Sequence, residues 1–283
     1  MEEFVESLLI IVVLYNIPLE ESESFRSIRE MDTGGGINLF VYDNSKRPQT
    51  IKAYDGLHIT YVHDSKNSGV SKAYNEGAEH ARKHKKKWVL LLDQDTALPA
   101  TLLNSYREAT EKNPELKLFV PVLKLKNGKI FSPCTYRFKR GFYLDTIEKG
   151  IHSLQKLSPV NSGMLIDVDA FFEVGGYNDQ VKLDFSDFQF IERFRKRYSD
   201  FYVLDVNCSQ DFSDDEVSLA SQANRFGYYC EGARNIEKNG LWVWLQYNTV
   251  VFLRAARLGL RYKDLRFLGI YLDTFLFPKS TKE

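Results

Sequence analysis

Short apolar runs alternate with polar turns through the first hundred residues. Four runs are apolar at nearly every position: Leu8–Leu14, Ile37–Tyr42, Ile59–Val62 and Trp88–Leu92. Continuous runs of this length are typical of parallel strands that are buried on both faces. After the third run the spacing of small and apolar residues becomes helical, at Ala73, Asn75, Gly77, Ala78 and Ala81. This alternation predicts βαβ units and an α/β fold with a mainly parallel sheet.

Every one of these predicted strands ends in polar turn residues. The segments that follow are Tyr15-Asn16, Asp43-Asn44-Ser45, Asp64 to Gly69, and Asp93-Gln94-Asp95. Right-handed crossovers place the carboxyl ends of parallel strands at one edge of the sheet, where ligands of α/β proteins bind. We therefore expect distant parts of the chain to meet in one crevice, with Tyr15, Asp43, Asn67, Asp93 and Asp95 lining it.

The triplet Asp93-Gln94-Asp95 projects two carboxylates from the end of a buried strand. Mg²⁺ and Mn²⁺ take oxygen ligands, and one or two carboxylates commonly hold such an ion while substrate phosphates complete its shell. Two acids in a turn also occur as a solvated loop or a helix cap. By itself the triplet is compatible with both interpretations.

Taken together, the motifs resemble family 2 glycosyltransferases, and the D-Q-D triplet most resembles the rhamnosyltransferase-like branch. The resemblance covers about residues 8 to 235 and rests on segments in a consistent order: Val13 to Asn16, Val41 to Ser45, Asn67 to Gly69, Asn75 to Gly77, Leu92 to Asp95, Asn161 to Ile166, Gly175 to Asn178, and Asp184 to Asp187. It implies a GT-A fold, a nucleotide-sugar donor, a divalent metal ion, and transfer with inversion at the anomeric carbon.

The resemblance also implies roles for individual residues. Asp43 accepts a hydrogen bond from the ring N–H of uracil or thymine, Asp93 binds the ribose, and Asp95 coordinates Mg²⁺ or Mn²⁺. A turn in which Asp43 binds its own backbone, and an ordinary helix cap at Asn67 and Gly69, are the structural alternatives. The full set of expected nucleotide-sugar ligands is Tyr15, Asn16, Asp43, Asn67, Gly69, Lys72, Asn75, Asp93 and Gln94.

An acceptor hydroxyl needs a base, because its own pKa lies far above neutrality. By resemblance Asp187 is this base and Asp184 is the reserve candidate. The alternative is that Asp184 or Ser186 caps the helix that follows, while Asp187 interacts with its dipole. One departure from the family is the absence of a histidine after the strand Tyr202–Val206, where Asp211 is the candidate replacement as a metal ligand.

Composition is compatible with an enzyme of the cytoplasm. The 283 residues carry 38 basic and 38 acidic side chains, so no global charge attracts nucleic acid. Three cysteines without paired spacing indicate a reducing compartment. The N-terminus lacks the basic region of a signal peptide, and the run Leu8–Leu14 is too short to span a bilayer.

The C-terminal fifth of the chain has a different character. Helical patterns run through Tyr228–Lys238, Leu241–Leu258 and Asp264–Phe277, with aromatic residues beside arginines. We expect a GT-A catalytic domain at 1–217, with a nucleotide-sugar half at about 1–125 and an acceptor half at about 126–217, followed by a helical region at 218–283. This region either lies on the membrane surface or packs on the core or on a second subunit.

The sequence thus predicts an inverting glycosyltransferase that uses a metal ion and an aspartate base. The leading donor is dTDP-rhamnose, and the acceptor is a glycan or a lipid-linked glycan of a bacterial surface polysaccharide. A UDP-hexose transferase is the runner-up, because uracil and thymine present the same N3–H. A non-catalytic nucleotide-sugar binder or scaffold is the alternative from another class, and a nucleotidyltransferase is a minor one.

Overall fold

The structure, a computed structural model, describes residues 1–31, 35–210 and 218–278. The predicted α/β class is confirmed. The strands are β1 (Leu8–Leu14), β2 (Ile37–Asp43), β3 (Leu57–His63), β4 (Trp88–Asp93), β5 (Thr96–Ala97), β6 (Leu118–Lys124), β7 (Ile130–Arg137), β8 (Arg140–Leu144), β9 (Gly150–Ser153), β10 (Leu157–Ser158), β11 (Met164–Asp167) and β12 (Asp200–Gln210). The helices are α1 (Glu2–Glu6), α2 (Glu23–Arg29), α3 (Val70–Lys83), α4 (Leu102–Lys112), α5 (Val168–Glu173), α6 (Ser186–Phe194), α7 (Leu219–Asn235), α8 (Leu241–Tyr262) and α9 (Arg266–Ile270), with a 3-10 turn at Leu19–Glu21 and a π-helix at Tyr271–Leu276.

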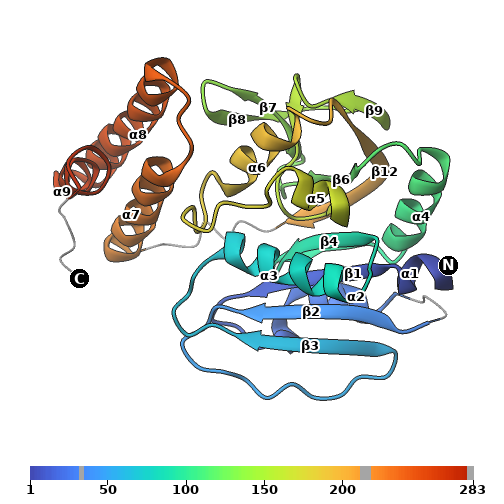
Figure 1. Cartoon of the computed structure of the whole chain (residues 1–283). Helices are drawn as coiled ribbons and strands as arrows, with labels where there is room; N and C mark the ends of the chain where they lie inside the picture. The colour runs from blue at the N-terminus through green and yellow to red at the C-terminus, as the bar shows by residue number, and fades with distance from the viewer. Residues whose placement is uncertain (32–34, 211–217, 279–283) are drawn as a thin grey trace.

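The sheet is mixed but parallel where the nucleotide half was expected. Its strands follow the order β10-β7-β6-β11-β4-β1-β2-β3, and β1 pairs in parallel with both β2 and β4. Further along, β11 runs antiparallel between β4 and β6, and β12 pairs in parallel with β6 (Figure 1). The four apolar runs of the sequence therefore form adjacent strands whose carboxyl ends lie at one edge.

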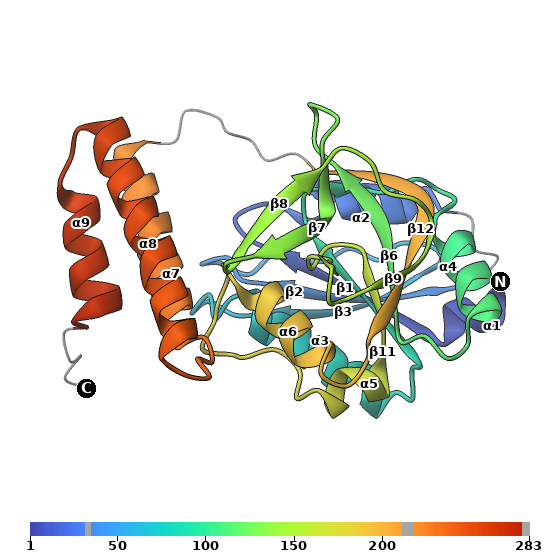
Figure 2. The same cartoon turned by 90° about the horizontal axis from the view of Figure 1, so that it is seen from above.

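Helices cover both faces of this sheet, which explains why β1 is apolar at every position. Side chains alternate between the faces of a strand. Leu8, Ile10 and Val12 pack in one buried cluster with α2 and α4, whereas Leu9 and Ile11 pack in another with α3, α5 and α6. Figure 2 shows α3, α5 and α6 together on one side of the strands.

The C-terminal helices α7, α8 and α9 form a separate layer beside the sheet (Figure 1). Their own apolar cluster includes two residues of the loop before α6, Val181 and Phe185. The first helix begins at Leu219, nine residues earlier than the sequence pattern predicted, because the Ser218 hydroxyl caps it by accepting from Ser221 N at 3.2 Å. The loop that carries the expected catalytic acids is thus packed against the C-terminal layer.

Gly69 joins the nucleotide half to the same loop. Its backbone lies at φ 97° and ψ 179°, a region that residues with a Cβ avoid. A Cβ at this position would lie 2.2 Å from the Lys182 carbonyl oxygen, which accepts a hydrogen bond from Val70 N at 2.8 Å. The Ser71 hydroxyl donates to the Val181 carbonyl. The start of α3 and segment 181–182 are therefore in direct contact.

We expect Gly69→Ala to destabilise the fold more than Gly240→Ala. Both glycines precede helices with nearly the same backbone angles, since Gly240 has φ 101° and ψ 165°. Only Gly69 has a neighbour where the new methyl would stand, because nothing lies within 4 Å of a Cβ at Gly240. The unfavourable backbone region costs both variants about 1–3 kcal/mol, and the displaced carbonyl costs Gly69→Ala roughly 1–3 kcal/mol more. Denaturant unfolding measures the difference, and equal losses would contradict the contact.

Candidate functional site

The tips of β1, β2 and β4 are tied together by hydrogen bonds. Tyr15 N donates to Gln94 Oε1 at 2.7 Å, and Asn16 N donates to Ser45 Oγ at 2.8 Å. These bonds join residues that are 79 and 29 positions apart in the chain. The structure thus brings Tyr15 and Gln94 together at one point, and Asn16 and Ser45 at another.

Asp93 is the most enclosed acid of the triplet. Its Oδ1 accepts from the Tyr74 hydroxyl at 2.8 Å, and its backbone N–H donates to the Ser162 hydroxyl at 3.1 Å. Burial, and next the charge of Asp95, raise the pKa of Asp93 to about 6, against the opposing effect of the bond from Tyr74. Two carboxylates in so small a space favour a bound cation or a shared proton.

Gln210 contacts both acids of the triplet, and the sequence analysis did not assign it a role. Its Nε2 lies 3.1 Å from Asp95 Oδ1 and 3.5 Å from Asp93 Oδ2. It ends β12, where the register places it opposite Thr96, the residue after Asp95. The signal that could have revealed Gln210 was its place in the segment where the family histidine was missing. The candidate from that segment, Asp211, lies outside the described residues.

Asp187 lies in the first turn of α6 and is partly buried. Its Oδ1 accepts from Phe188 N at 2.7 Å. Burial raises the pKa of Asp187 to about 7, and the charges of Asp184 and Asp93 add to the rise against the effect of the Phe188 bond. Because Asp93 contributes to this shift, the acid of α6 and the acid of β4 lie within electrostatic range of each other.

Two tyrosines fill the space between α3 and α6. The rings of Tyr74 and Tyr177 are 5.4 Å apart, and Tyr177 stacks on Phe190 of α6 at 4.5 Å. Because the Tyr74 hydroxyl also donates to Asp93, this aromatic chain links β4 to the helix that carries Asp187. Asn161 completes the link by accepting from the Tyr177 hydroxyl at 2.8 Å.

The structural alternative for the start of α6 is wrong about the cap, although Asp187 does lie in the first turn of the helix, as that alternative expected. Neither Asp184 nor Ser186 caps the helix: the residue at the cap position is Phe185, which makes no side-chain cap, and the Ser186 hydroxyl donates backwards to the Leu183 carbonyl at 2.7 Å. Asp184 instead pairs with Arg225 of α7, with its Oδ2 at 3.5 Å from Nε. The reserve acid is thus held by the C-terminal layer.

Phe185 has left-handed backbone angles, with φ 73°, which are rare for a bulky residue. Its ring packs against Tyr229 of α7 at 4.6 Å and Tyr247 of α8 at 5.5 Å. A Cβ at Gly232 of α7 would lie 2.7 Å from the Asp184 carbonyl oxygen, so the helix backbone presses directly on the acid loop. Strained backbone of this kind persists only where packing on several sides fixes it.

Asp43 is buried and already has four donors, one of which is the Ser45 hydroxyl. Ser45 N reaches its Oδ1 at 2.9 Å, while Gln49 Nε2 and the Tyr61 hydroxyl reach its Oδ2 at 2.9 and 2.8 Å. Burial alone would raise the pKa of Asp43, but these hydrogen bonds outweigh it and lower the pKa. A carboxylate has about four acceptor positions, and these four donors occupy them. The turn interpretation is observed, and the base contact stays a prediction.

The other expected nucleotide ligands have protein partners. Gly69 N points to Asn44 Oδ1 at 3.4 Å, and Asn67 N donates to the Asp64 carbonyl at 3.1 Å. Lys72 forms an ion pair with Glu76 at 3.3 Å on the surface of α3. Asn75 binds the backbone of Tyr177 through both its amide nitrogen and its oxygen, each at 2.9 Å. Its observed contacts connect α3 to the loop after α5, and its role toward a nucleotide stays a prediction.

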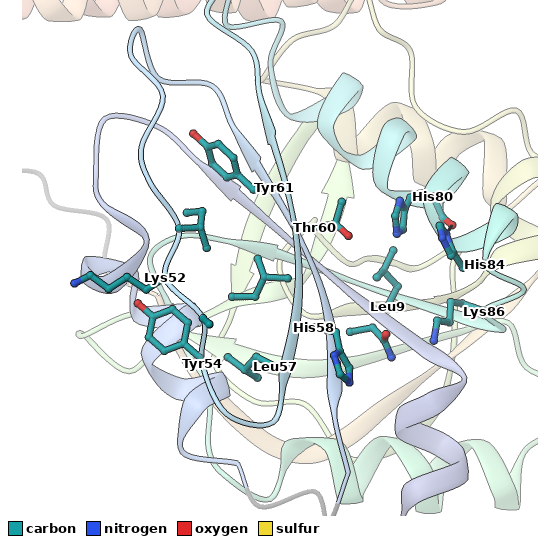
Figure 3. A pocket seen from close by; sticks show the side chains of 14 residues that line it. Leu9, Lys52, Tyr54, Leu57, His58, Thr60, Tyr61, His80, His84 and Lys86 are labelled. Atoms are coloured by element: carbon teal, nitrogen blue, oxygen red, sulfur yellow. Dashed lines mark hydrogen bonds between the residues drawn. The ribbon is translucent and has the colours of Figure 1, made fainter.

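Two large cavities lie away from this acid cluster. One, with a volume of about 770 Å³, follows the edge strand β3, with His80 and His84 on one side and Lys52 and Tyr54 on the other (Figure 3). A second, of about 690 Å³, adjoins the amino ends of β2 and β3. Neither is lined by any of the expected site residues that the structure describes.

The acid cluster has the donor types that a hard divalent cation prefers. Within the part of the chain that the structure describes, no group of three or more His, Cys, Asp or Glu side chains forms a metal site. However, Mg²⁺ is often held by one or two carboxylates together with substrate phosphates. Asp93 and Asp95 supply the carboxylates, and the buried Gln210 Oε1 beside them has no hydrogen-bond donor among the described residues. The residues present therefore fit such an ion.

Solved structures share the fold. The chain resembles TarS of S. aureus with a TM-score of 0.56 and 14% identity, covering 93% of this chain and 44% of TarS. S. aureus TarS 1-349 in complex with UDP-GlcNAc matches with a TM-score of 0.53 and 14% identity, and the match covers 98% of this chain and 77% of that one. GalNAc-T7 with UDP, GalNAc and Mn²⁺ matches with a TM-score of 0.58 and 11% identity, and the match covers 96% of this chain and 58% of that one. The chain thus spans less than half the length of TarS, and at these identities the likeness shows a common GT-A fold.

A search for sequence relatives among curated proteins finds no match. The sequence model described as "Glycosyl transferase family 2" matches residues 9–157, which is more than half of the 283 residues. That segment contains the four parallel strands and the Asp93-Gln94-Asp95 triplet. The chain belongs to glycosyl transferase family 2.

Proposed function

We propose that this protein transfers a sugar from a nucleoside-diphosphate donor to an acceptor hydroxyl, with inversion at the anomeric carbon. The observation that carries the proposal is the position of Asp187. It is a partly buried acid in the first turn of α6, a helix that the stacked Phe190, Tyr177 and Tyr74 rings connect to Asp93. Its pKa, raised to about 7 by burial, suits proton transfer at neutral pH. Family membership and the fold of the structural neighbours support the same activity.

In this mechanism the acceptor oxygen attacks the anomeric carbon while the bond from that carbon to the diphosphate oxygen breaks. Asp187 takes the proton of the acceptor hydroxyl as the new bond forms. When bound, a divalent cation at Asp95 supplies positive charge that stabilises the departing diphosphate. Asp93, with its pKa raised to about 6, is still mostly ionised at neutral pH and accepts from the donor ribose.

The donor base is proposed to be thymine or uracil, because the resemblance assigns Asp43 to the N3–H that both bases offer. In the bound state this N3–H replaces one of the four protein donors of Asp43. The resemblance of the D-Q-D triplet favours dTDP-rhamnose. The structural neighbours favour a uridine donor, because TarS was solved with UDP and with UDP-GlcNAc, and GalNAc-T7 with UDP. A UDP-sugar is therefore the second candidate, and titration with UDP and dTDP separates the two.

We expect Asp187→Asn to lower turnover by roughly 10²- to 10⁴-fold, the usual contribution of a general base, while nucleotide affinity stays within about twofold. In the active protein turnover should rise with pH through about 7, because only the ionised carboxylate accepts a proton. Product formation at several pH values and calorimetric titration with UDP and dTDP measure these effects. Unchanged turnover would exclude Asp187 as the base, no turnover in the wild type would support a non-catalytic binder, and a large loss of affinity would give Asp187 a structural role.

The same substitution should have a pH-dependent effect on stability. Native Asp187 keeps its proton up to about pH 7, whereas an ordinary aspartate loses it near 3.8. Between these values the native state binds more protons than the unfolded state, so its stability falls as pH rises. Asparagine does not titrate, so Asp187→Asn lacks this pH-dependent decrease in the free energy of unfolding. We therefore expect the stability of the variant, relative to that of the wild type, to increase from pH 4 to pH 7 and then level off. Parallel stability curves would contradict the raised pKa.

We also propose that α8 rests on an anionic membrane surface near a lipid-linked acceptor. Of the helices in residues 1–31, 35–210 and 218–278, none is long and apolar enough to cross a membrane. One face of α8, about a third of its circumference at 3.6 residues per turn, is nevertheless exposed and uncharged. Its large apolar residues are Leu241, Trp242, Leu245, Phe252, Leu253 and Leu260, of which Leu260 is 81% and Trp242 66% exposed.

The charges of α8 favour lipid over a second copy of the chain. The helix has three arginines, Arg254, Arg257 and Arg261, and no acidic residue. Arg254 stacks on the ring of Tyr229 at 3.9 Å, which leaves Arg257 and Arg261 exposed beside the apolar face. Packing α8 on its own copy would bury the apolar face without bringing any acid of the helix to these arginines, whereas anionic headgroups would pair with them.

We expect the triple variant Trp242→Gln, Leu253→Gln, Leu260→Gln to lose at least about tenfold in binding to vesicles that contain phosphatidylglycerol, since burying one large apolar side chain contributes about 1.5–3 kcal/mol. The helix itself remains, so Tyr247 still packs on Phe185. Ile151→Gln is the control, because Ile151 is 55% exposed on β9. Sedimentation with vesicles measures binding. If the triple variant bound vesicles as well as the wild type, the proposed contact between α8 and the membrane would be refuted. If the wild type formed a dimer and the triple variant did not, the apolar face of α8 would be assigned to self-association.

A further inference from the structure

Gln210 is placed by strand pairing. It is 5% exposed and ends β12, whose antiparallel pairing with β5 sets Ser209 opposite Ala97 and Gln210 opposite Thr96. Because Thr96 directly follows Asp95, this register delivers the side chain to the acid pair. The contact therefore depends on the backbone of two strands and not on a flexible loop.

The two ends of the Gln210 amide have unequal surroundings. Its Nε2 lies between Asp95 Oδ1 at 3.1 Å and Asp93 Oδ2 at 3.5 Å. Its Oε1 is buried, and no donor in the described part of the chain reaches it. Buried polar atoms are nearly always paired, and an exception in a native structure calls for a functional or structural reason. A buried oxygen without a donor, next to two carboxylates, points to a binding site for a cation.

We propose that Gln210 is a positioning residue that serves the acid pair in two states. Without a cation, its N–H₂ group donates to Asp93 and Asp95 and holds them at one spacing. With a cation at the pair, the amide turns over so that Oε1 faces the ion. A carboxamide can do both, because its nitrogen and oxygen have nearly the same shape and amide oxygens are ligands for hard divalent ions.

A structural role for Gln210 is the alternative to this proposal. Gln210 ends β12 and contacts the acids of the D-Q-D triplet. A purely structural role, in which Gln210 only fastens β12 to the end of β4, would need the nitrogen alone. The unpaired oxygen is what separates the two roles. This inference rests on the metal ion of the proposed function.

The test is the Mn²⁺ affinity of three variants, measured by isothermal titration calorimetry on the full chain with and without UDP or dTDP. Gln210→Met keeps the size of the side chain and removes both polar ends. Gln210→Glu keeps the oxygen and removes the donor. Asp95→Asn reports on the metal site itself. Thermal unfolding of each metal-free variant shows that it is folded.

We expect Gln210→Met to bind Mn²⁺ about 10- to 100-fold more weakly, the usual loss when a supporting group of a metal site is removed. Gln210→Glu should bind Mn²⁺ at least as tightly as the wild type, and should unfold at a lower temperature without metal, because a third acid replaces the donor. If Gln210 had a structural role only, the Mn²⁺ affinity of Gln210→Met would stay within twofold of wild type, and this result would overturn the proposal.

The failure of this inference can be separated from the failure of the proposed function. If wild type binds Mn²⁺, Asp95→Asn does not, and Gln210→Met does, then the metal site stands and the role of Gln210 falls. If wild type binds no Mn²⁺ with either nucleotide, the metal part of the proposed function fails and this inference fails with it. Addition of EDTA to the wild type before titration controls for metal carried through purification.

Discussion

Crowding of carboxylates at the carboxyl edge of the sheet is the constraint around which this molecule is built. Asp93 ends a strand buried on both faces, Asp95 follows two residues later, and Asp187 approaches from α6. Burial and mutual repulsion raise the pKa of Asp93 and of Asp187 to about 6 and about 7. Burying carboxylates close together costs free energy, and proteins retain such an arrangement where the charges serve a ligand. The tyrosine hydroxyl and the glutamine amide around Asp93 reduce the repulsion without removing it.

The acid on α6 depends on the C-terminal layer as much as on the sheet. Phe185 adopts left-handed angles, and the rings of Tyr229 and Tyr247 enclose it. Arg225 of α7 pairs with Asp184, two residues before the helix begins. From the other side, Lys182 meets the start of α3 at Gly69. The loop is thus held between two parts of the chain that never touch the reacting atoms in the proposed mechanism.

The sequence could predict what local pattern determines. β1 is buried on both faces, so its run Leu8–Leu14 is apolar throughout and its limits could be predicted to the residue. The contacts of Gln210 could not be predicted, because they depend on the pairing of β12 with β5, more than a hundred residues earlier. Likewise, the start of α7 at Leu219 depends on a single serine cap. The fold class follows from periodicity, whereas the environment of each acid follows from long-range packing.

The close approach of Gly232 to the Asp184 carbonyl has a consequence for how this enzyme can diversify. A C-terminal segment borrowed from another member of the family would have to bring a residue without a side chain at this point, and two aromatic rings at the positions of Tyr229 and Tyr247. The C-terminal layer therefore cannot be exchanged independently of the loop before α6. The two segments have to change together in the course of evolution.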